Sequence, residues 1–214
     1  MTTAAPRVLR VDLVDVLATQ VLLGVTLGRE AREKLTLLAQ PDPEILVISL
    51  LKAMCVDYRF VGEAIGSITE APAARPAPVV EIVPEYHRLN VLEGIVWKSE
   101  HGYRNRSPVE LEEMLRSSAR RVVLRERTPT GFALSYVGAT EQETELVSVV
   151  ERYSERTVGE CARELQRPID QTGEALLALA RKGFIYRKSP QAGGVETRFL
   201  ALTTLLEAND VASR

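Results

Sequence analysis

The 214-residue sequence predicts an α/β module in the first third of the chain and an α+β module in the last third. The first module is predicted by an alternating apolar run at residues 8–14 and a nearly continuous one at 44–51, with a helical pattern between them. The second module is predicted by three helical patterns and two short β patterns that follow residue 140. We therefore expect three parts: residues 1–70, a middle part at 71–139, and residues 140–214.

Within residues 1–70 the expected order is strand, helix, strand, helix. Four apolar residues recur at helical spacing after the first strand: Leu27, Ala31, Leu35 and Leu38. The apolar run at 44–51 is typical of a central strand covered on both faces. Asp57 can cap the next helix, which turns Val61, Ala64, Ile65 and Ile68 inward. This order predicts two parallel strands joined by a right-handed crossover.

Residues 48–66, ISLLKAMCVDYRFVGEAIG, resemble the strand-to-helix segment of STAS domains, the fold of anti-sigma-factor antagonists. The segment 28–32, GREAR, resembles a helix of STAS-like variants that accompany DNA-binding modules. The resemblance covers residues 1–70 and extends at most to residue 100. It implies an α/β STAS-like module that binds a protein partner or a second copy of the chain. In the antagonists a phosphorylatable serine follows the aspartate, but Tyr58 and Arg59 follow Asp57 here, so the phosphoserine switch is not carried over.

The middle part, residues 71–139, begins with a Pro/Ala-rich connector at 71–78. We expect a strand at 79–83 that adds to the first sheet, and then a helix whose apolar face is Leu89, Leu92 and Val96. Two β patterns flank a turn at 128–131 and predict a hairpin. The sequence leaves open whether residues 79–138 complete the first sheet or form a separate domain.

Residues 140–214 contain the clearest helix signals. The first helix is expected at 141–153, and Thr157 with Glu160 forms a capping box that opens the second. Asp170 can cap the third helix, which Gly183 ends in a left-handed turn. Two β runs at 184–187 and 197–202 complete the order helix, helix, helix, strand, turn, strand.

That order is the winged helix-turn-helix order, and residues 175–187, ALLALARKGFIYR, resemble the recognition-helix exit of bacterial winged-helix regulators. The resemblance implies an α+β winged-helix domain whose third helix enters the major groove of DNA. Gln171 and Thr172, with Glu174 as a further position, would then face the bases. The cations assigned to phosphates are Arg167, Arg181, Lys182, Arg187 and Lys188.

A second candidate surface is the cationic run at 104–127, in which seven arginines stand against four glutamates. It is interpreted either as a solvated face or as a stripe that faces a polyanion. Arg120, Arg121 and Arg125 of this run are candidate DNA contacts. If the run held single-stranded or structured nucleic acid, binding would not need residues 140–214.

The charge of the chain argues against DNA binding. The net charge is −2, which excludes a protein that coats nucleic acid by bulk charge, and residues 140–214 carry 10 basic against 12 acidic groups. Asp170 and Glu174 lie on or beside the expected reading face and repel phosphates. Two hypotheses follow: a homodimeric regulatory protein that binds double-stranded DNA, or a protein-interaction scaffold whose winged helix does not bind DNA.

Other classes of protein lack support in the sequence. It contains no Walker-type loop, GxGxxG turn, GxSxG elbow or HExxH helix, and neither His87 nor His101 has a partner at zinc-ligand spacing. We therefore expect no enzyme, cofactor or metal. Cys55 and Cys161 cannot build a disulfide framework, and neither a membrane span nor a signal peptide is visible, so we expect a cytoplasmic protein without a membrane partner.

Overall fold

The structure is a computed structural model with a mixed α/β fold. It describes residues 6–40, 43–66, 68, 77–82, 86–90, 95–98, 121–128, 131–188 and 196–212. The chain divides into two compact units. The N-terminal unit comprises residues 9–72 and 77–138, and the C-terminal unit comprises residues 1–8, 73–76 and 139–214.

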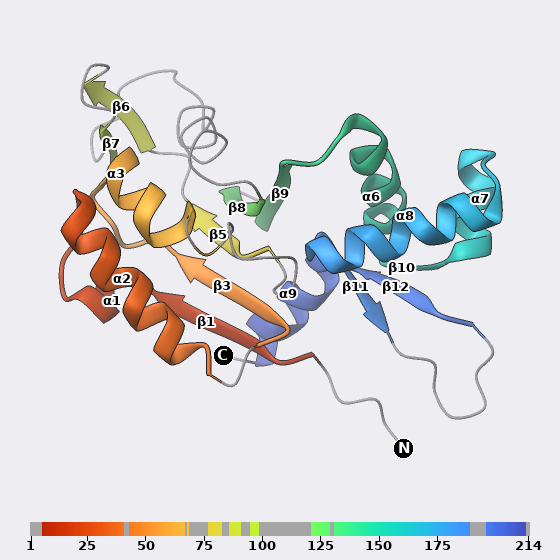
Figure 1. The fold of residues 1–214 in the computed structure, drawn as a ribbon, viewed down its shortest axis with the longest axis horizontal. Coiled ribbons are helices and arrows are strands. Elements are labelled where there is room, and N and C mark those ends of the chain that lie inside the picture. The colour runs from red at the N-terminus through yellow and green to blue at the C-terminus, as the bar shows by residue number, and fades with distance from the viewer. Residues whose placement is uncertain are drawn as a thin grey trace. The chain divides into compact units, whose positions relative to one another are not determined.

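The N-terminal unit is built on a five-stranded sheet in the order β1-β3-β5-β8-β9. Its strands are β1 (Val8–Asp12), β3 (Ile45–Ser49), β5 (Val79–Ile82), β8 (Val122–Thr128) and β9 (Gly131–Val137). Strand β5 pairs in parallel with both β3 and β8, and β8 and β9 form an antiparallel pair. Figure 1 draws β1 beside β3, pointing the same way. The predicted strand at 79–83 and the two strands of the predicted hairpin thus all belong to the first sheet.

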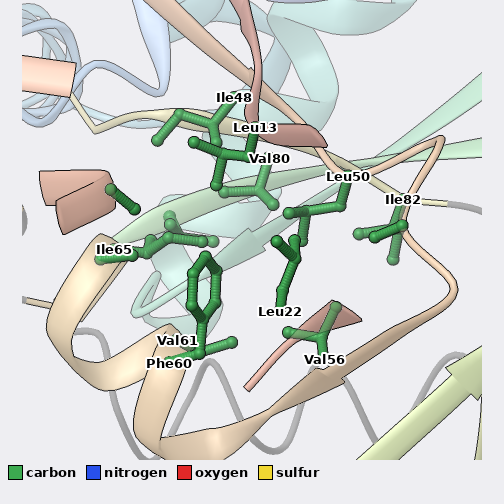
Figure 2. Packing of buried hydrophobic residues seen from close by; sticks show 14 of the residues in the cluster. Leu13, Leu22, Ile48, Leu50, Val56, Phe60, Val61, Ile65, Val80 and Ile82 are labelled. Carbon is green, nitrogen blue, oxygen red and sulfur yellow. The ribbon is translucent and has the colours of Figure 1, made fainter. Parts of the chain in front are cut away.

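Helices pack against one face of this sheet and bury a large apolar cluster. They are α1 (Leu13–Leu17), α2 (Val25–Leu38), α3 (Tyr58–Val61) and the π-helix η1 (Gly62–Gly66). Figure 2 shows Phe60 of α3 among Leu22, Ile65 and Val61, with Leu50, which directly follows β3, also in the cluster. The expected helix over the 57–68 region is therefore present, but its second half is a π-helix, which the apolar spacing did not indicate.

The first strand is shorter than predicted. Residues 13–14 were expected to continue it, but the Asp12 carboxylate accepts hydrogen bonds from the backbone N–H groups of Val14 (3.0 Å) and Asp15 (3.4 Å) and caps α1. The prediction is wrong there because Leu13 and Val14 are buried from a helical turn, and burial alone does not distinguish a turn from a strand.

A second sheet in the N-terminal unit has the order β2-β4-β7-β6. Its strands are β2 (Val21–Leu22), β4 (Cys55–Asp57), β7 (Ile95–Lys98) and β6 (Tyr86–Asn90). The helix predicted over 89–98 is wrong, since β6 and β7 pair with each other antiparallel. Three apolar residues at spacings of three and four satisfied the helical pattern, whereas Ile95, Val96 and Trp97 have high β propensity.

The C-terminal unit combines three helices with a three-stranded antiparallel sheet in the order β10-β12-β11, followed by a last helix. Its elements are α6 (Glu141–Tyr153), β10 (Glu155–Thr157), α7 (Val158–Leu165), α8 (Ile169–Lys182), β11 (Ile185–Lys188), β12 (Arg198–Ala201) and α9 (Leu202–Ala212). Figure 1 shows α6, α7 and α8 together with this sheet. The three predicted helices and two predicted strands are present; β10 and α9 were not predicted.

Local capping explains the helix boundaries of this unit. Thr140 with Glu143, and Thr157 with Glu160, form complete capping boxes at α6 and α7. Gly183 ends α8 at φ 80°, a left-handed conformation that favours glycine. The predicted Asp170 cap is wrong: the N-cap of α8 is Pro168, two residues earlier, and Asp170 lies in the first turn of the helix. In the described ranges, no helix is both long enough and apolar enough to span a bilayer.

Candidate nucleic-acid interface

Helix α8 has a buried side and an exposed stripe. Thr172, Leu176 and Leu179 point into the core of the C-terminal unit and are at most 2% exposed. A Cβ built at Gly173 would lie 3.4 Å from Cγ1 of Val158, so α7 and α8 pack closely at this point. The exposed residues on the helix are Ile169, Asp170, Gln171, Glu174 and Arg181. A partner that approaches α8 from outside therefore meets one aliphatic side chain, one amide, two carboxylates and one guanidinium.

Of the three predicted base-facing positions, Gln171 and Glu174 are exposed and Thr172 is not. Thr172 is 2% exposed, and its hydroxyl donates a hydrogen bond to the carbonyl oxygen of Pro168 (2.9 Å). The prediction for Thr172 is therefore wrong. The sequence contained the signal, since Thr172 lies four residues before Leu176 and so shares its buried face.

Most of the predicted phosphate-binding cations form ion pairs within the unit. Arg167 pairs with Glu145, and Lys182 pairs with Glu143 at 2.5 Å. Glu155 accepts from Lys188 at 3.5 Å and also from Arg198 at 3.1 Å. Arg181 and Arg187 are exposed, and neither forms an ion pair with any residue that the structure describes. The candidate interface thus has two available cations and four that carboxylates already hold.

Glu143 has two roles in this arrangement. One oxygen accepts from the backbone N–H of Thr140 (2.9 Å) in the α6 capping box, and the other accepts from Lys182 (2.5 Å). Partial burial opposes ionisation, but these hydrogen bonds prevail and lower the pKa of Glu143 below its ordinary value. No local sequence pattern reveals Glu143, Glu145 or Glu155 as a partner, because these ion pairs span 39, 22 and 33 residues.

Within the described part of the cationic run at 104–127, Arg125 is buried and so is not available to DNA. Arg125 is 1% exposed: its guanidinium donates to Glu81 (2.5 Å) and lies 3.7 Å from the centre of the Phe132 ring. Its assignment to DNA is therefore wrong, because β8 places Arg125 in register with Glu81 of β5, inside the sheet. Arg121 is half-buried, and Arg120 lies outside the described residues.

The buried thiols are poor nucleophiles. Burial raises the pKa of Cys161 to about 11, although Arg156 opposes the shift. Burial also raises the pKa of Cys55. Among the residues that the structure describes, no group of three or more His, Cys, Asp or Glu could hold a metal ion.

No family model matches this chain, and no curated protein matches it.

Proposed function

We propose that this protein is a DNA-binding regulatory protein in which residues 139–214 act as a winged helix. The observation that supports it is the order α6, β10, α7, α8, β11, β12, with β10 and β11 on either side of β12. This is the arrangement of a winged helix-turn-helix, in which the third helix enters the major groove and the strands carry the wing. The N-terminal unit is then the STAS-like module that binds a protein partner or a second copy of the chain.

The exposed chemistry of α8 assigns roles within this proposal. Gln171 lies in the first turns of α8, and a glutamine amide pairs bidentately with adenine in the major groove. Arg181 at the end of α8 and Arg187 on β11 are exposed guanidiniums that bind phosphates. A surface with two available cations binds DNA weakly and with a shallow salt dependence, unless a dimer doubles the contacts.

The test is a fluorescence-anisotropy titration of the full chain with random duplex DNA at about 50 mM and about 200 mM salt. We expect binding at the lower salt concentration. Arg187→Ala should flatten the salt slope by about 0.9, whereas Gln171→Ala should change sequence preference and leave the slope unchanged. Arg29→Ala is the control, because it removes one exposed cation from the N-terminal unit. Absence of binding at low salt by folded protein contradicts the proposal.

A second candidate function is a protein-interaction scaffold whose winged helix binds protein. The observation that favours it is the acidic stripe of α8, where Asp170 and Glu174 flank Gln171. Copurification from native lysate distinguishes the two functions. Partners that a nuclease releases support DNA binding, and partners that survive nuclease support the scaffold.

A further inference from the structure

Three glutamates hold four cations at the surface of the C-terminal unit. Helix α6 supplies Glu143 and Glu145, and β10 supplies Glu155. Their partners lie between α7 and α8 (Arg167), at the end of α8 (Lys182), and on the two paired strands β11 and β12 (Lys188 and Arg198). In the proposed winged-helix function, these four cations lie beside the third helix and on the wing strands, where they would meet the DNA backbone.

The exposure of these pairs makes them weak as supports of the fold. The side chains of Arg167 and Glu145 are 33% and 54% exposed, and those of Arg198 and Glu155 are 55% and 28% exposed. Exposed ion pairs contribute about 0–1 kcal/mol to stability. Stability alone therefore does not account for a carboxylate beside each of these cations.

The same ion pairs have a larger effect on the affinity for a polyanion such as DNA. A phosphate must displace the glutamate from each cation, and the displaced carboxylate then remains close by as a like charge. Sequence-independent DNA affinity comes almost entirely from contacts between cations and phosphates. Contacts between Gln171 and a base edge do not use these cations and are not weakened in the same way.

We propose that Glu145 and Glu155 determine specificity by competing with DNA phosphates for Arg167, Lys188 and Arg198. This inference rests on the proposed function. By suppressing binding to random DNA, the two carboxylates increase the ratio of specific to non-specific affinity, because specificity is a difference between two binding free energies. Glu143 is left out of the test because it also caps α6.

The test measures binding of Glu145→Gln and Glu155→Gln chains to random duplex DNA by fluorescence anisotropy. Each cation that gains a phosphate adds about 0.9 to the salt slope, which corresponds to about eightfold tighter binding at about 0.1 M salt. Glu155→Gln releases two cations and should show the larger effect. Circular dichroism checks that both variants are folded.

The matched control is Glu207→Gln on α9. It removes the same charge from an exposed residue that has no ion pair with any residue of the described ranges. Tighter binding and a steeper slope for Glu145→Gln and Glu155→Gln than for Glu207→Gln support the inference. Equal binding by all three variants overturns it, and wild-type binding in that case leaves the proposed function standing. If neither the wild type nor any variant binds at low salt, the proposed function fails and the inference fails with it.

Discussion

The N-terminal unit buries its central ion pair, whereas the C-terminal unit keeps its ion pairs at the surface. Glu81 and Arg125 are each 1% exposed, and Arg10 also donates to Glu81 (2.6 Å). Arg167 and Glu145 of the C-terminal unit are one-third and one-half exposed. A buried charge cannot lose its partner without a large penalty, while an exposed one can exchange its partner for water or a ligand. The first arrangement stabilises a fold, and the second can control binding.

The largest expected effect is that of removing the buried cation. Arg125→Met leaves Glu81 buried with Arg10 as its remaining cation, and should lower the free energy of unfolding by about 3 kcal/mol. Arg167→Met breaks an exposed pair and should cost less than about 1 kcal/mol. Urea unfolding followed by circular dichroism checks both changes, and the fluorescence of Trp97 of β7, the single tryptophan, reports on the N-terminal unit. Equal losses would contradict the comparison.

Two helix-interior glycines give a second contrast between the units. A Cβ at Gly28 of α2 would lie 2.7 Å from Cβ of Glu63 and 2.9 Å from the carbonyl oxygen of Phe60, so Gly28→Ala should destabilise by about 2 kcal/mol. Gly173→Ala of α8 meets only ordinary contacts with Val158 and should stabilise by about 0.5 kcal/mol. Thermal unfolding followed by circular dichroism measures both. A stabilising Gly28→Ala would show that α2 and η1 can separate freely.

The two helix caps Asp57 and Thr157 should differ by a smaller amount in what they contribute to the free energy of unfolding. The Asp57 carboxylate accepts from the N–H of Phe60 (2.7 Å) in α3 and from that of Gly24 (3.0 Å) at the start of α2, so it holds two helix N-termini. Asp57→Ala should cost about 2 kcal/mol and Thr157→Ala, which uncaps α7 alone, about 1 kcal/mol. Tryptophan fluorescence in urea should detect the first change. Equal costs by circular dichroism would show that the contact with Gly24 adds nothing.

The smallest expected effect is the acid sensitivity of the C-terminal unit. Hydrogen bonding to the backbone N–H of Thr157, against a weaker effect of burial, lowers the pKa of Glu160, and the pKa of Glu143 is lowered too. A lowered folded-state pKa stabilises fully above the ordinary value of 4.5, and that stability is lost as pH falls through the folded value. Unfolding monitored at decreasing pH should show this loss, and Glu160→Gln should reduce it. An unchanged acid profile for Glu160→Gln would contradict the assignment.

Local signals predicted much of the fold. The caps at Thr157 and Asp57 and the left-handed Gly183 are set by residues close together in the sequence, which sequence spacing shows directly. The hairpin of β8 and β9 was also predicted, because its turn lies between two β patterns. The short apolar spacing at 89–98 fitted a helix and a strand pair equally well, and only strand pairing distinguishes the two.

The candidate interface was less predictable from sequence. Helical periodicity places Gln171 on the exposed side of α8 and Thr172 on the buried side. The burial of Thr172 was therefore predictable from the sequence. The partners of Arg125, Arg167 and Lys188 lie 44, 22 and 33 residues away, so no local pattern reveals them. The amino-acid sequence by itself determined where the helices α2, α6, α7 and α8 lie, because capping and periodicity act over a single turn. Only the tertiary structure decided which cations are buried, paired or available, because an ion pair depends on which elements the fold brings together.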